Sequence, residues 1–422
     1  MLDLKYIREN PEAVAAGLAA KNTQLDLRGF LAMDAEKRSL LREAEDLKAK
    51  RNLANDEISK AKKNGGDAST LINRIKPLSQ KIANLELKVG EIDIKINDML
   101  LYFPNMPQKD VPVSKGAEAN KVIRSWGEPR RLDFKVKDHL DLATSLGWLS
   151  METGSKISGA GFPVFFGEGA KLQRALISLM LDMHVRRHGY KEVWPPSIVN
   201  RASMRGTGQL PKMEGDMYCL GDDEQNAGNL FLIPTAEVPV TNCLRDTILE
   251  EKDLPVKYTA YTPCFRKEAG SYGKDTRGLS RVHQFDKVEM VKFVKPEGSD
   301  QELETLVQDA EDVLQALELP YRAVLLGSGD MSFAAAKCYD LEVWAPATEK
   351  WFEVSSCSLF TDFQARRMNI RYRNARTKKL EYVHTLNGSG LALARIVLCL
   401  LENFQNESGQ VVFPKALQAY LV

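Results

Sequence analysis

The stretch FRKEAGSYGKDTRGLSRVHQFDKVEM, from Phe265 to Met290, begins and ends like a β-strand but carries charged side chains where a strand facing a core would be apolar. Its middle part contains Gly270, Gly273 and Gly278, which predicts two antiparallel strands joined by a flexible loop. The loop is not the P-loop of an NTPase, because the first glycine of that motif would fall on Glu268. The charges on the two strands therefore need another explanation.

Alternation along the two strands indicates which side chains share a face, because residues two apart on a strand point the same way. The first strand groups Arg266 with Glu268, and the second groups Phe285, Lys287 and Glu289. At about 3.3 Å per residue, Phe285 and Glu289 are roughly 13 Å apart, which suits one elongated ligand. Arginine offers a planar fork to a phosphate, and a carboxylate accepts from an amine. The strands alone leave a solvated hairpin with alternating charges as the alternative.

The chain beyond residue 131 contains further short strands and amphipathic helices. Helices are expected at 172–183, at 303–317 and within GLALARIVLCLLENF, which begins at Gly390. Strand-like runs occur at NLFLIPT, VKYTAYTPCFR, VHQFDKVEMVKFV, YRAVLLG, CYDLEVWAP and KWFEVSSCS. Because strands follow strands through short polar turns, we expect an α+β domain with a mainly antiparallel sheet flanked by helices.

Near the N-terminus, apolar residues alternate in steps of four and three, which is the period of a coiled coil. The turn KKNGGDAST separates two such seams, so an antiparallel helical hairpin is expected, with helices of about 28 residues and about 40 Å. Pro77 is expected to kink the second helix or to mark its true start. The seams comprise Leu40, Ala44, Leu47, Ala54, Ile58 and Ala61, interrupted by Arg51, and then Leu71, Ile75, Leu78, Ile82, Leu85, Val89, Ile92, Ile96 and Met99.

The charge of this hairpin is uneven, although the whole chain has a net charge of only +1. Residues 37–63 contain nine Lys or Arg and five Asp or Glu, whereas residues 64–100 contain five of each. The first helix is therefore a local basic surface, interpreted either as a solvated face or as a nucleic-acid contact.

The length of the chain, its apolar runs and its cysteines indicate the class of protein to which it belongs. With 422 residues, two domains are expected, and the linker-like stretch FPNMPQKDVPVSKGAEAN suggests an arm domain at 1–103, a linker at 104–131 and a second domain at 132–422. The sequence begins without an apolar leader and contains no apolar run long enough for a membrane span. Its six scattered cysteines suit reduced thiols, so a cytoplasmic location without membrane partners is expected.

Three segments in order resemble the signatures of the class II aminoacyl-tRNA synthetases, and among these the bacterial seryl-tRNA synthetases. HGYKEVWPPSIVN resembles the first signature, FRKE…TRGLSRVHQF the second and GSGLALARIVLCLLE the third. TAE at 235–237 and EVSS at 353–356 lie between them. The resemblance extends over nearly the whole chain, arm included, and implies the class II synthetase fold for the second domain.

The resemblance also implies roles for individual residues. Arg266 would hold the α-phosphate of ATP, Arg395 the γ-phosphate, and Glu353 with Ser356 the nucleotide and its Mg²⁺; Arg266, Glu353 and Arg395 are the expected catalytic residues. The implied ATP-binding residues are Arg266, Lys267, Glu268, Phe285, Glu353, Val354, Ser355, Ser356 and Arg395. The implied L-serine-binding residues are Thr235, Ala236, Glu237, Arg266, Glu289, Asn387 and Ser389.

Some of these roles keep alternatives. Glu237 either contacts serine or only orients Thr235, and Ser389 could also serve as the N-cap of the last helix. Two stretches depart from the usual pattern of the family: Gly161-Phe162-Pro163 replaces an arginine-bearing turn, and Leu359-Phe360 replaces a more polar pair.

The activity implied by the resemblance is ATP-dependent formation of seryl-adenylate and transfer of serine to serine tRNA, with selenocysteine tRNA as a further substrate to consider. The implied partners are ATP, L-serine, the long variable arm of serine tRNA and a second copy of the chain in a homodimer. Arm contacts to tRNA are expected from Lys48, Lys50, Arg51 and Lys60. Alternatives are a related ligase that loads a carrier protein, which would lack the arm, and a non-catalytic tRNA-binding paralogue, which would lack Arg266, Arg395 or Glu353.

Overall fold

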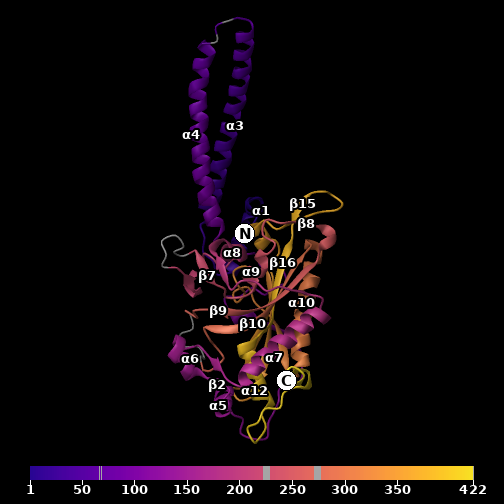
Figure 1. The fold of residues 1–422 in the computed structure, drawn as a ribbon. Coiled ribbons are helices and arrows are strands. Elements are labelled where there is room, and N and C mark those ends of the chain that lie inside the picture. Colours follow the sequence, from indigo (N-terminus) through magenta and orange to yellow (C-terminus); the bar gives the residue numbers. More distant parts are fainter. Residues whose placement is uncertain (66, 68, 222–228, 270–276, 422) are drawn as a thin grey trace. The chain divides into compact units, whose positions relative to one another are not determined.

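The computed structural model describes residues 1–65, 67, 69–221, 229–269 and 277–421 (Figure 1). The chain forms two compact units. The first, here called the arm unit, consists of Leu2–Leu18 and Thr23–Phe103. The second, here called the sheet unit, consists of Met1, Ala19–Asn22 and Pro104–Val422. Gly270 and Gly273 of the predicted loop lie outside the described residues.

The arm unit contains two short helices, α1 (Leu4–Glu9) and α2 (Pro11–Ala20), and two long helices, α3 (Leu27–Lys63) and α4 (Ser69–Leu100). The last two residues of α2, Ala19 and Ala20, belong to the sheet unit. The two long helices lie side by side and antiparallel (Figure 1). Asp26 caps α3 by accepting a hydrogen bond from the Gly29 amide at 2.9 Å. The predicted hairpin is therefore confirmed.

The burial of the long helices follows the predicted seams. Ala44, Ile82, Leu85 and Ile96 are buried, and the other seam residues with described side chains are half-buried. The side chain of Leu71 lies outside the described residues. Ion pairs Lys37–Asp93, Lys48–Glu86 and Lys81–Glu43 cross between the helices. Pro77 lies inside α4, so the alternative that it marks the start of this helix is wrong.

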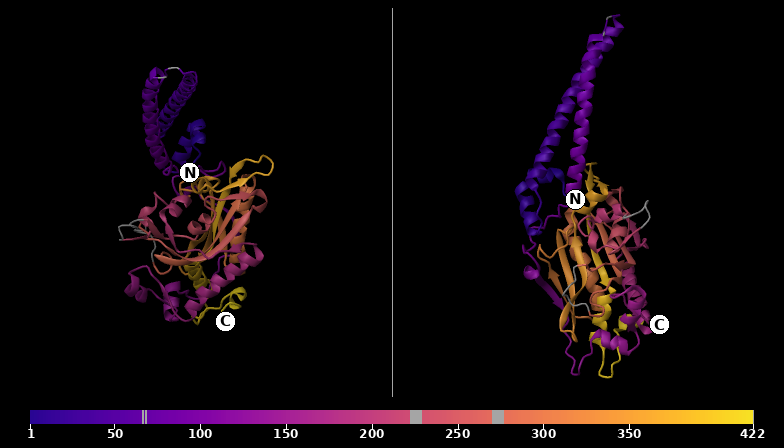
Figure 2. Two further views of the ribbon diagram at one scale, coloured as in Figure 1. Left: turned by 45° about the horizontal axis from the view of Figure 1, so that its top comes forward. Right: turned by 90° about the vertical axis from the view of Figure 1, so that its left-hand side faces the viewer.

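The sheet unit is built on an eight-stranded sheet in the order β1-β11-β12-β13-β16-β10-β9-β4. All neighbouring pairs are antiparallel except β4 with β9, so the predicted α+β class is confirmed. Figure 2 shows its orange and yellow strands from two further directions. The strands are β1 (Lys121–Trp126), β4 (Lys191–Glu192), β9 (Val256–Phe265), β10 (Gln284–Val294), β11 (Tyr321–Leu325), β12 (Lys337–Ala345), β13 (Lys350–Leu359) and β16 (His384–Ala392).

Smaller sheets and helices surround this sheet. β2 (Leu149–Ser150) pairs with β3 (Val164–Phe165), β7 (Leu230–Leu232) with β5 (Ile198–Asn200) and β6 (Cys219–Leu220), and β14 (Arg371–Arg373) with β8 (Ile248–Glu250) and β15 (Leu380–Tyr382). The helices are α5 (His139–Ser145), α6 (Met151–Ser158), α7 (Glu168–Asp182), which continues as the π-helical turn η2 (Met183–Arg187), α8 (Arg201–Thr207), α9 (Glu237–Asn242), α10 (Ser299–Ala316), α11 (Phe363–Met368), α12 (Leu393–Phe404) and α13 (Lys415–Gln418). Short 3₁₀ turns are η1 (Ala117–Ala119), η3 (Glu214–Asp216), η4 (Glu251–Asp253) and η5 (Pro296–Gly298).

The main core lies between the sheet and helices α7, α10 and α12, which contact strands β10, β13 and β16. The shorter helices α9 and α11 contact β10 and β16 through a second apolar cluster. Strands β10, β13 and β16 are thus supported by helices, which holds the polar residues they carry in fixed positions.

Several bounds differ from the sequence-based expectation. Helices α3 and α4 have 37 and 32 residues and are longer than the expected length of about 28. The last helix begins at Leu393, because Gly390 to Ala392 continue strand β16. Ser389 therefore lies within a strand, and its interpretation as a helix N-cap is wrong; the N-cap position is Ala392. Strand β1 lies within the residues expected to form a linker and pairs with β11. Among the described residues, no helix combines the length and apolar character that a membrane span requires.

Candidate active site

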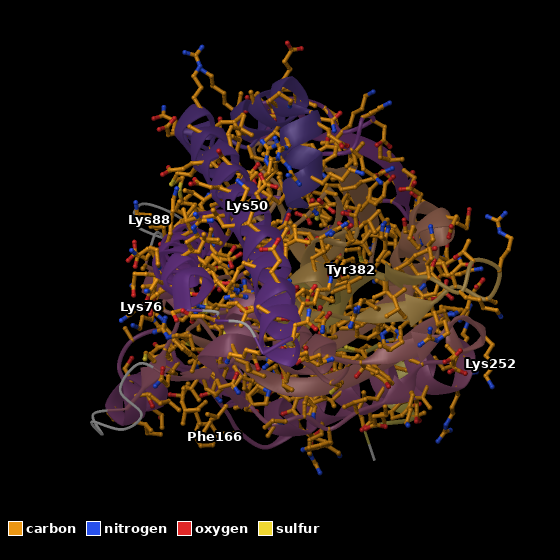
Figure 3. The ribbon with its side chains drawn as sticks, turned by 90° about the horizontal axis from the view of Figure 1, so that it is seen from above. Lys50, Lys76, Lys88, Phe166, Lys252 and Tyr382 are labelled. Atoms are coloured by element: carbon orange, nitrogen blue, oxygen red, sulfur yellow. The ribbon has the colours of Figure 1, made fainter. Side chains whose placement is uncertain are left out.

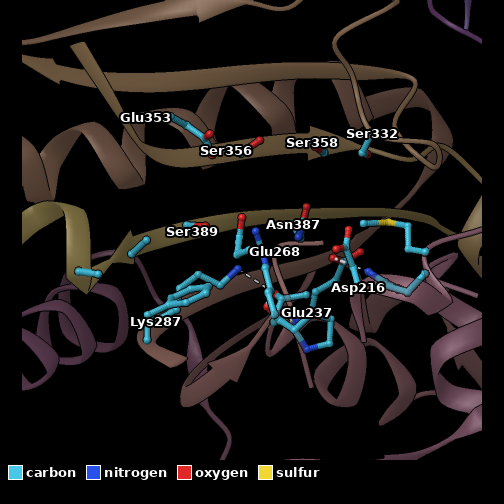
Figure 4. Close-up of a pocket in the computed structure, with 18 of the residues that line it drawn as sticks. Asp216, Glu237, Glu268, Lys287, Ser332, Glu353, Ser356, Ser358, Asn387 and Ser389 are labelled. Carbon is cyan, nitrogen blue, oxygen red and sulfur yellow. Dashed lines mark hydrogen bonds between the residues drawn. The ribbon is translucent and has the colours of Figure 1, made fainter. Parts of the chain in front are cut away.

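A cavity of about 510 Å³ in the sheet unit brings together most of the predicted site residues. Figure 4 shows Glu353 and Ser356 along one strand and Asn387 and Ser389 along its neighbour, with Lys287 and Glu237 below them. The predicted residues that line it are Thr235, Glu237, Arg266, Glu268, Phe285, Glu353, Val354, Ser356, Asn387, Ser389 and Arg395. Ala236, Lys267, Glu289 and Ser355 are not part of the lining.

Arg266 lies over Phe285 at one end of the cavity. Its guanidinium carbon is 5.3 Å from the centre of the Phe285 ring, and its Nε donates to the Pro234 carbonyl at 3.3 Å. A cation over an aromatic face is attracted by the ring, so the two side chains hold each other in place. Phe285 provides a planar surface, and Arg266 provides a fork that can bind a phosphate beside it.

The first strand of the hairpin is shorter than predicted. β9 ends at Phe265, and the Lys267 amide donates to the Asp216 carbonyl at 2.9 Å instead of continuing the sheet ladder. Glu268 follows with a φ of +51°, which is left-handed. Arg266 and Glu268 therefore do not share the face of a strand, and that expectation is wrong. Both side chains line the cavity all the same.

Two arginines pair with acidic residues around the rim of the cavity. Arg281 donates to Glu268 at 2.7 Å. Arg395, near the start of α12, donates through Nε to the Ser280 carbonyl at 3.2 Å and through Nη1 to the Glu353 carboxylate at 3.2 Å. These pairs are partly exposed, so each arginine can exchange its carboxylate for a ligand phosphate at little cost.

A buried charged cluster lies at the other end of the cavity. The Glu289 side chain is fully buried and forms an ion pair with Lys287. Thr235 Oγ1 and Asn387 Nδ2 both donate to the Glu289 carboxylate, each at 3.0 Å. Lys287 Nζ also donates to Thr235 Oγ1 at 2.8 Å. A buried carboxylate without such partners would be costly, and the ion pair with Lys287 compensates the charge of Glu289 here.

Glu237 is the first residue of α9 and the second buried carboxylate at this end of the cavity. Gln364 donates to its Oε1 at 2.7 Å, and its own amide donates to Thr235 Oγ1 at 3.1 Å. Burial, followed by repulsion from Glu289, raises the pKa of Glu237 to about 7. Glu237 thus supports Thr235 and also presents a carboxylate to the cavity.

The third group of polar residues lies on strands β12 and β13. Asp340 is opposite Ser356, and Glu342 is opposite Glu353. Burial, followed by repulsion from Glu353, raises the pKa of Asp340 well above its ordinary value. Val354 lines the cavity, whereas the Ser355 hydroxyl points to the Ser389 carbonyl at 2.6 Å.

This acidic edge fits a hard cation. Glu353 and Ser356 offer oxygen ligands to the cavity, and the acidic groups behind them repel one another. Among the described residues, no group of three or more His, Cys, Asp or Glu side chains could hold a metal ion by itself. A Mg²⁺ ion here would therefore need further oxygen ligands from a nucleotide and from water.

Several cavity residues were not predicted. Lys287 could have been, because it shares the strand face of Phe285 and Glu289. The others include residues of loops and short helices and Ser358 of strand β13: Thr207, Gly208, Gln209, Met213, Asp216, Met217, Arg281, Ser332, Phe333, Ala334, Ser358 and Phe360.

Lys21 supports one wall of the cavity from the far end of the sequence. Its Nζ donates to the Ser332 and Ala335 carbonyls at 2.7 and 2.9 Å. Burial lowers its pKa to about 7. A residue from the first hundred positions thus belongs to the sheet unit and fixes the loop around Phe333, which lines the cavity.

The four residues predicted to contact tRNA lie on α3. Lys50 and Lys60 are exposed, Lys48 pairs with Glu86 at 2.7 Å, and Arg51 occupies a half-buried seam position. Figure 3 labels Lys50 together with Lys76 and Lys88 on the two long helices. The basic surface is thus present, with Arg51 less accessible than the sequence suggests.

Comparison with known proteins gives consistent matches to both units. The model of the seryl-tRNA synthetase N-terminal domain matches residues 1–107. The model of the tRNA synthetase class II core domain (G, H, P, S and T) matches residues 218–404. The two matches fall on the arm and on the part of the chain that forms most of the cavity.

Individual relatives match over the whole length. The serine–tRNA ligase of Chloroherpeton thalassium is 52% identical and covers 100% of this chain and 99% of its own. That of Caldicellulosiruptor bescii is 53% identical with the same coverage. Among solved structures, the seryl-tRNA synthetase of Pyrococcus horikoshii complexed with ATP matches with a TM-score of 0.93 and 38% identity, covering 100% of this chain and 98% of its own.

Proposed function

The chain belongs to the seryl-tRNA synthetase family, and from this premise we propose that it activates L-serine with ATP and transfers serine to serine tRNA. The observation that carries the proposal is a single cavity with two different ends. Arg266 over Phe285 suits a purine nucleotide, and the cluster around Glu289 suits a small polar amino acid. An elongated adenylate would connect the two ends.

The chemical step needs positioning more than acid–base catalysis. The serine carboxylate, already ionised at neutral pH, attacks the α-phosphorus of ATP in line, and the bond to pyrophosphate breaks. Arg266 neutralises charge at the α-phosphate and Arg395 at the γ-phosphate. Phe285 lies under the adenine, and Glu268, with Lys267 beside it, faces its amino group. Val354 and Ser355 support the nucleotide through the backbone of β13.

Serine would be selected at the Glu289 end. Glu289 accepts the serine hydroxyl, with Asn387 and Ser389 beside it, and the segment Thr235 to Glu237 holds the ammonium group. Alanine would leave Glu289 without this donor, which disfavours it by about 1–3 kcal/mol. We add Lys287 to the proposed serine-binding residues, because it compensates the charge of Glu289.

Glu353 and Ser356 would hold Mg²⁺ together with phosphate oxygens of ATP and water. The ion supplies charge neutralisation for the departing pyrophosphate when it is bound. The oxygen donors of this edge and the repulsion between Asp340 and Glu353 support the assignment. Arg395, which donates to Glu353, orients this carboxylate toward the cavity.

The arm would hold the long variable arm of serine tRNA through phosphate contacts from Lys48, Lys50, Arg51 and Lys60. Selenocysteine tRNA is a further candidate, because contacts to the phosphate backbone recognise the shape of an RNA more than its sequence. We propose residues 1–103 as the arm domain and 132–422 as the catalytic domain, with 104–131 between them. We also propose a homodimer, which the resemblance implies, and a cytoplasmic location, which suits the proposed role in protein synthesis.

ATP–pyrophosphate exchange tests the proposed function directly. With each of the twenty amino acids tested in turn, serine is expected to support exchange with the highest kcat/KM, roughly 5- to 150-fold above that for alanine, because Glu289 requires a hydroxyl donor. The purified chain without tRNA is sufficient for this measurement. Exchange with a different amino acid but not with serine would refute the proposal, as would the absence of exchange with all twenty.

The pKa of Glu237 predicts a pH dependence of serine binding. Below about pH 7 the carboxyl of the empty site is mostly protonated, so it must lose a proton before it can pair with the serine ammonium group. The KM for serine is therefore expected to rise about tenfold per unit as the pH falls from about 7 to about 5. Glu237→Gln is expected to raise this KM above pH 7 and to remove its pH dependence.

The KM for ATP serves as the control, because Glu237 lies at the serine end. If the serine KM of the unmodified enzyme stays constant between about pH 5.5 and about pH 8, or if Glu237→Gln retains the same pH profile, Glu237 only orients Thr235.

A further inference from the structure

Strand β16 has a β-bulge beside the Glu289 end of the cavity. On β10, Val288 is opposite Leu391 and Glu289 is opposite Ser389, so Gly390 has no residue opposite it. The pairing of β16 with β13 extends only to Gly388. A bulge of this kind leaves backbone groups outside the ladder and turns the neighbouring side chains. Here the neighbouring side chain, Ser389, lines the cavity.

A buried histidine satisfies the carbonyl of the bulge. Nε2 of His184 is 3.2 Å from the Gly390 carbonyl oxygen, and His184 is fully buried. A Cβ atom on residue 390 would lie 2.3 Å from the same Nε2, so the ring packs directly against the backbone where only glycine fits. Because a carbonyl only accepts, Nε2 must carry the hydrogen.

The remaining contacts extend this bond into a chain of three side chains. Nδ1 of His184 is 3.0 Å from Nδ1 of His188, and Nε2 of His188 is 3.2 Å from Oδ2 of Asp312. Burial lowers the pKa of His184 to about 3, so this ring is neutral and its Nδ1 is an acceptor. His188 then donates from Nδ1 to His184, and its Nε2 faces the Asp312 carboxylate.

The turn η2, which continues α7, and helix α10 hold the three side chains in place. His184 lies in the π-helical turn η2, where the His188 amide bonds to the Met183 carbonyl at 3.2 Å. This turn brings the two rings together, with centroids 5.2 Å apart and planes tilted by 49°, and π-helical turns often occur at functional sites. Asp312 on α10 also pairs with Arg187 at 2.9 Å. Asp309, at 3.9 Å from His188, accepts from the Tyr190 hydroxyl at 2.7 Å.

We propose that His184, His188 and Asp312 form a positioning relay that fixes the Gly390 bulge and thereby sets Ser389 and Glu289 for serine recognition. The inference rests on the proposed function and adds residues to it. None of the three side chains lines the cavity, so the relay acts only through the backbone of β16. It connects helices α7 and α10 to the serine end of the site and leaves the nucleotide end untouched.

The separation of serine and ATP kinetics tests the relay. In serine-dependent pyrophosphate exchange, His184→Leu is expected to lower kcat/KM for serine roughly 10- to 100-fold, mainly through KM, because a displacement of about 1 Å has effects of this size. The KM for ATP is expected to change less than about twofold. His184→Gln places an N–H donor where Nε2 lies and is expected to restore most of the serine KM. Gly390→Ala, which displaces the ring from the other side, is expected to mimic His184→Leu.

His384→Leu is the matched control. His384 is a half-buried histidine on β16, and its Nδ1 contacts the Ser299 hydroxyl at 2.9 Å, away from the cavity. It is expected to leave the serine KM unchanged even if it lowers thermal stability. The relay is refuted if His184→Leu raises the KM values for serine and ATP equally, or if His184→Gln does not restore the KM for serine. It is also refuted if both His184→Leu and Gly390→Ala leave the KM for serine unchanged. A lack of exchange in the unmodified chain would instead refute the proposed function.

Discussion

Replacing Arg266 with alanine is expected to lower the kcat of serine-dependent ATP–pyrophosphate exchange by about 10³-fold or more. The guanidinium lies over Phe285 at 5.3 Å and is held by the Pro234 carbonyl, so it is already oriented before ATP binds. A preorganised donor at a phosphate that gains charge in the transition state typically contributes effects of this size.

The control for this prediction separates charge from geometry. Arg266→Lys keeps one positive charge but loses the bidentate fork and the planar contact with Phe285, so it is expected to recover only a small part of the activity. Arg373→Ala removes a half-exposed arginine of β14 near Glu250, outside the cavity, and is expected to leave exchange unchanged. Exchange by Arg266→Ala within about tenfold of the unmodified enzyme would exclude the assigned role.

Shortening the helical hairpin is expected to abolish tRNA charging and to spare amino-acid activation. Deletion of residues 46–84, with Glu45 and Leu85 joined by a Gly-Ser linker, removes the candidate phosphate contacts and keeps the Lys37–Asp93 ion pair. Serylation of serine tRNA is expected to fall at least roughly 100-fold in kcat/KM, because the affinity for a polyanion depends on several basic contacts. Serine-dependent pyrophosphate exchange should stay within about twofold, because all cavity residues belong to the sheet unit.

A full-length variant supports the interpretation of this deletion. Alanine at Lys48, Lys50, Arg51 and Lys60 is expected to weaken charging and to reduce its dependence on salt, as fewer counterions are released. Alanine at Lys76 and Lys88 of helix α4, which carries five Lys or Arg and four Asp or Glu, is the comparison and should have a smaller effect (Figure 3). Equal loss of exchange and charging in the shortened protein would contradict two separable functions.

Much of the fold was predictable because its signals are local. The seam of apolar residues in steps of three and four indicated the hairpin, and the burial of Ile82, Leu85 and Ile96 confirms it. The strand runs indicated an antiparallel sheet, which the order of β10, β9 and β16 confirms. The predicted strand end near Glu268 was wrong, because the Lys267 amide finds its partner at Asp216, some fifty positions away, and no local pattern reports such a contact.

Most residues of the site were predictable from the sequence, but the way in which their charges compensate one another was not. Alternation along β10 already placed Phe285 and Glu289 on one face. That Lys287 compensates Glu289, and that Thr235 accepts from this lysine, depends on two segments meeting across the sheet. The raised pKa of Glu237 has the same origin, since burial and the approach of Glu289 are both tertiary effects.

The sequence by itself determined the class of fold, the helical arm and the two kinds of ligand chemistry, because periodicity and signature residues are written in short stretches. Only the tertiary structure decided that Phe265 ends its strand, that Lys21 joins the sheet unit, and that the bulge at Gly390 meets His184. Each of these depends on a hydrogen bond or a buried contact between residues far apart in the chain. The stretch from Phe265 to Met290 therefore predicted a ligand-binding face, and its partners from other strands and helices determined how that face is built.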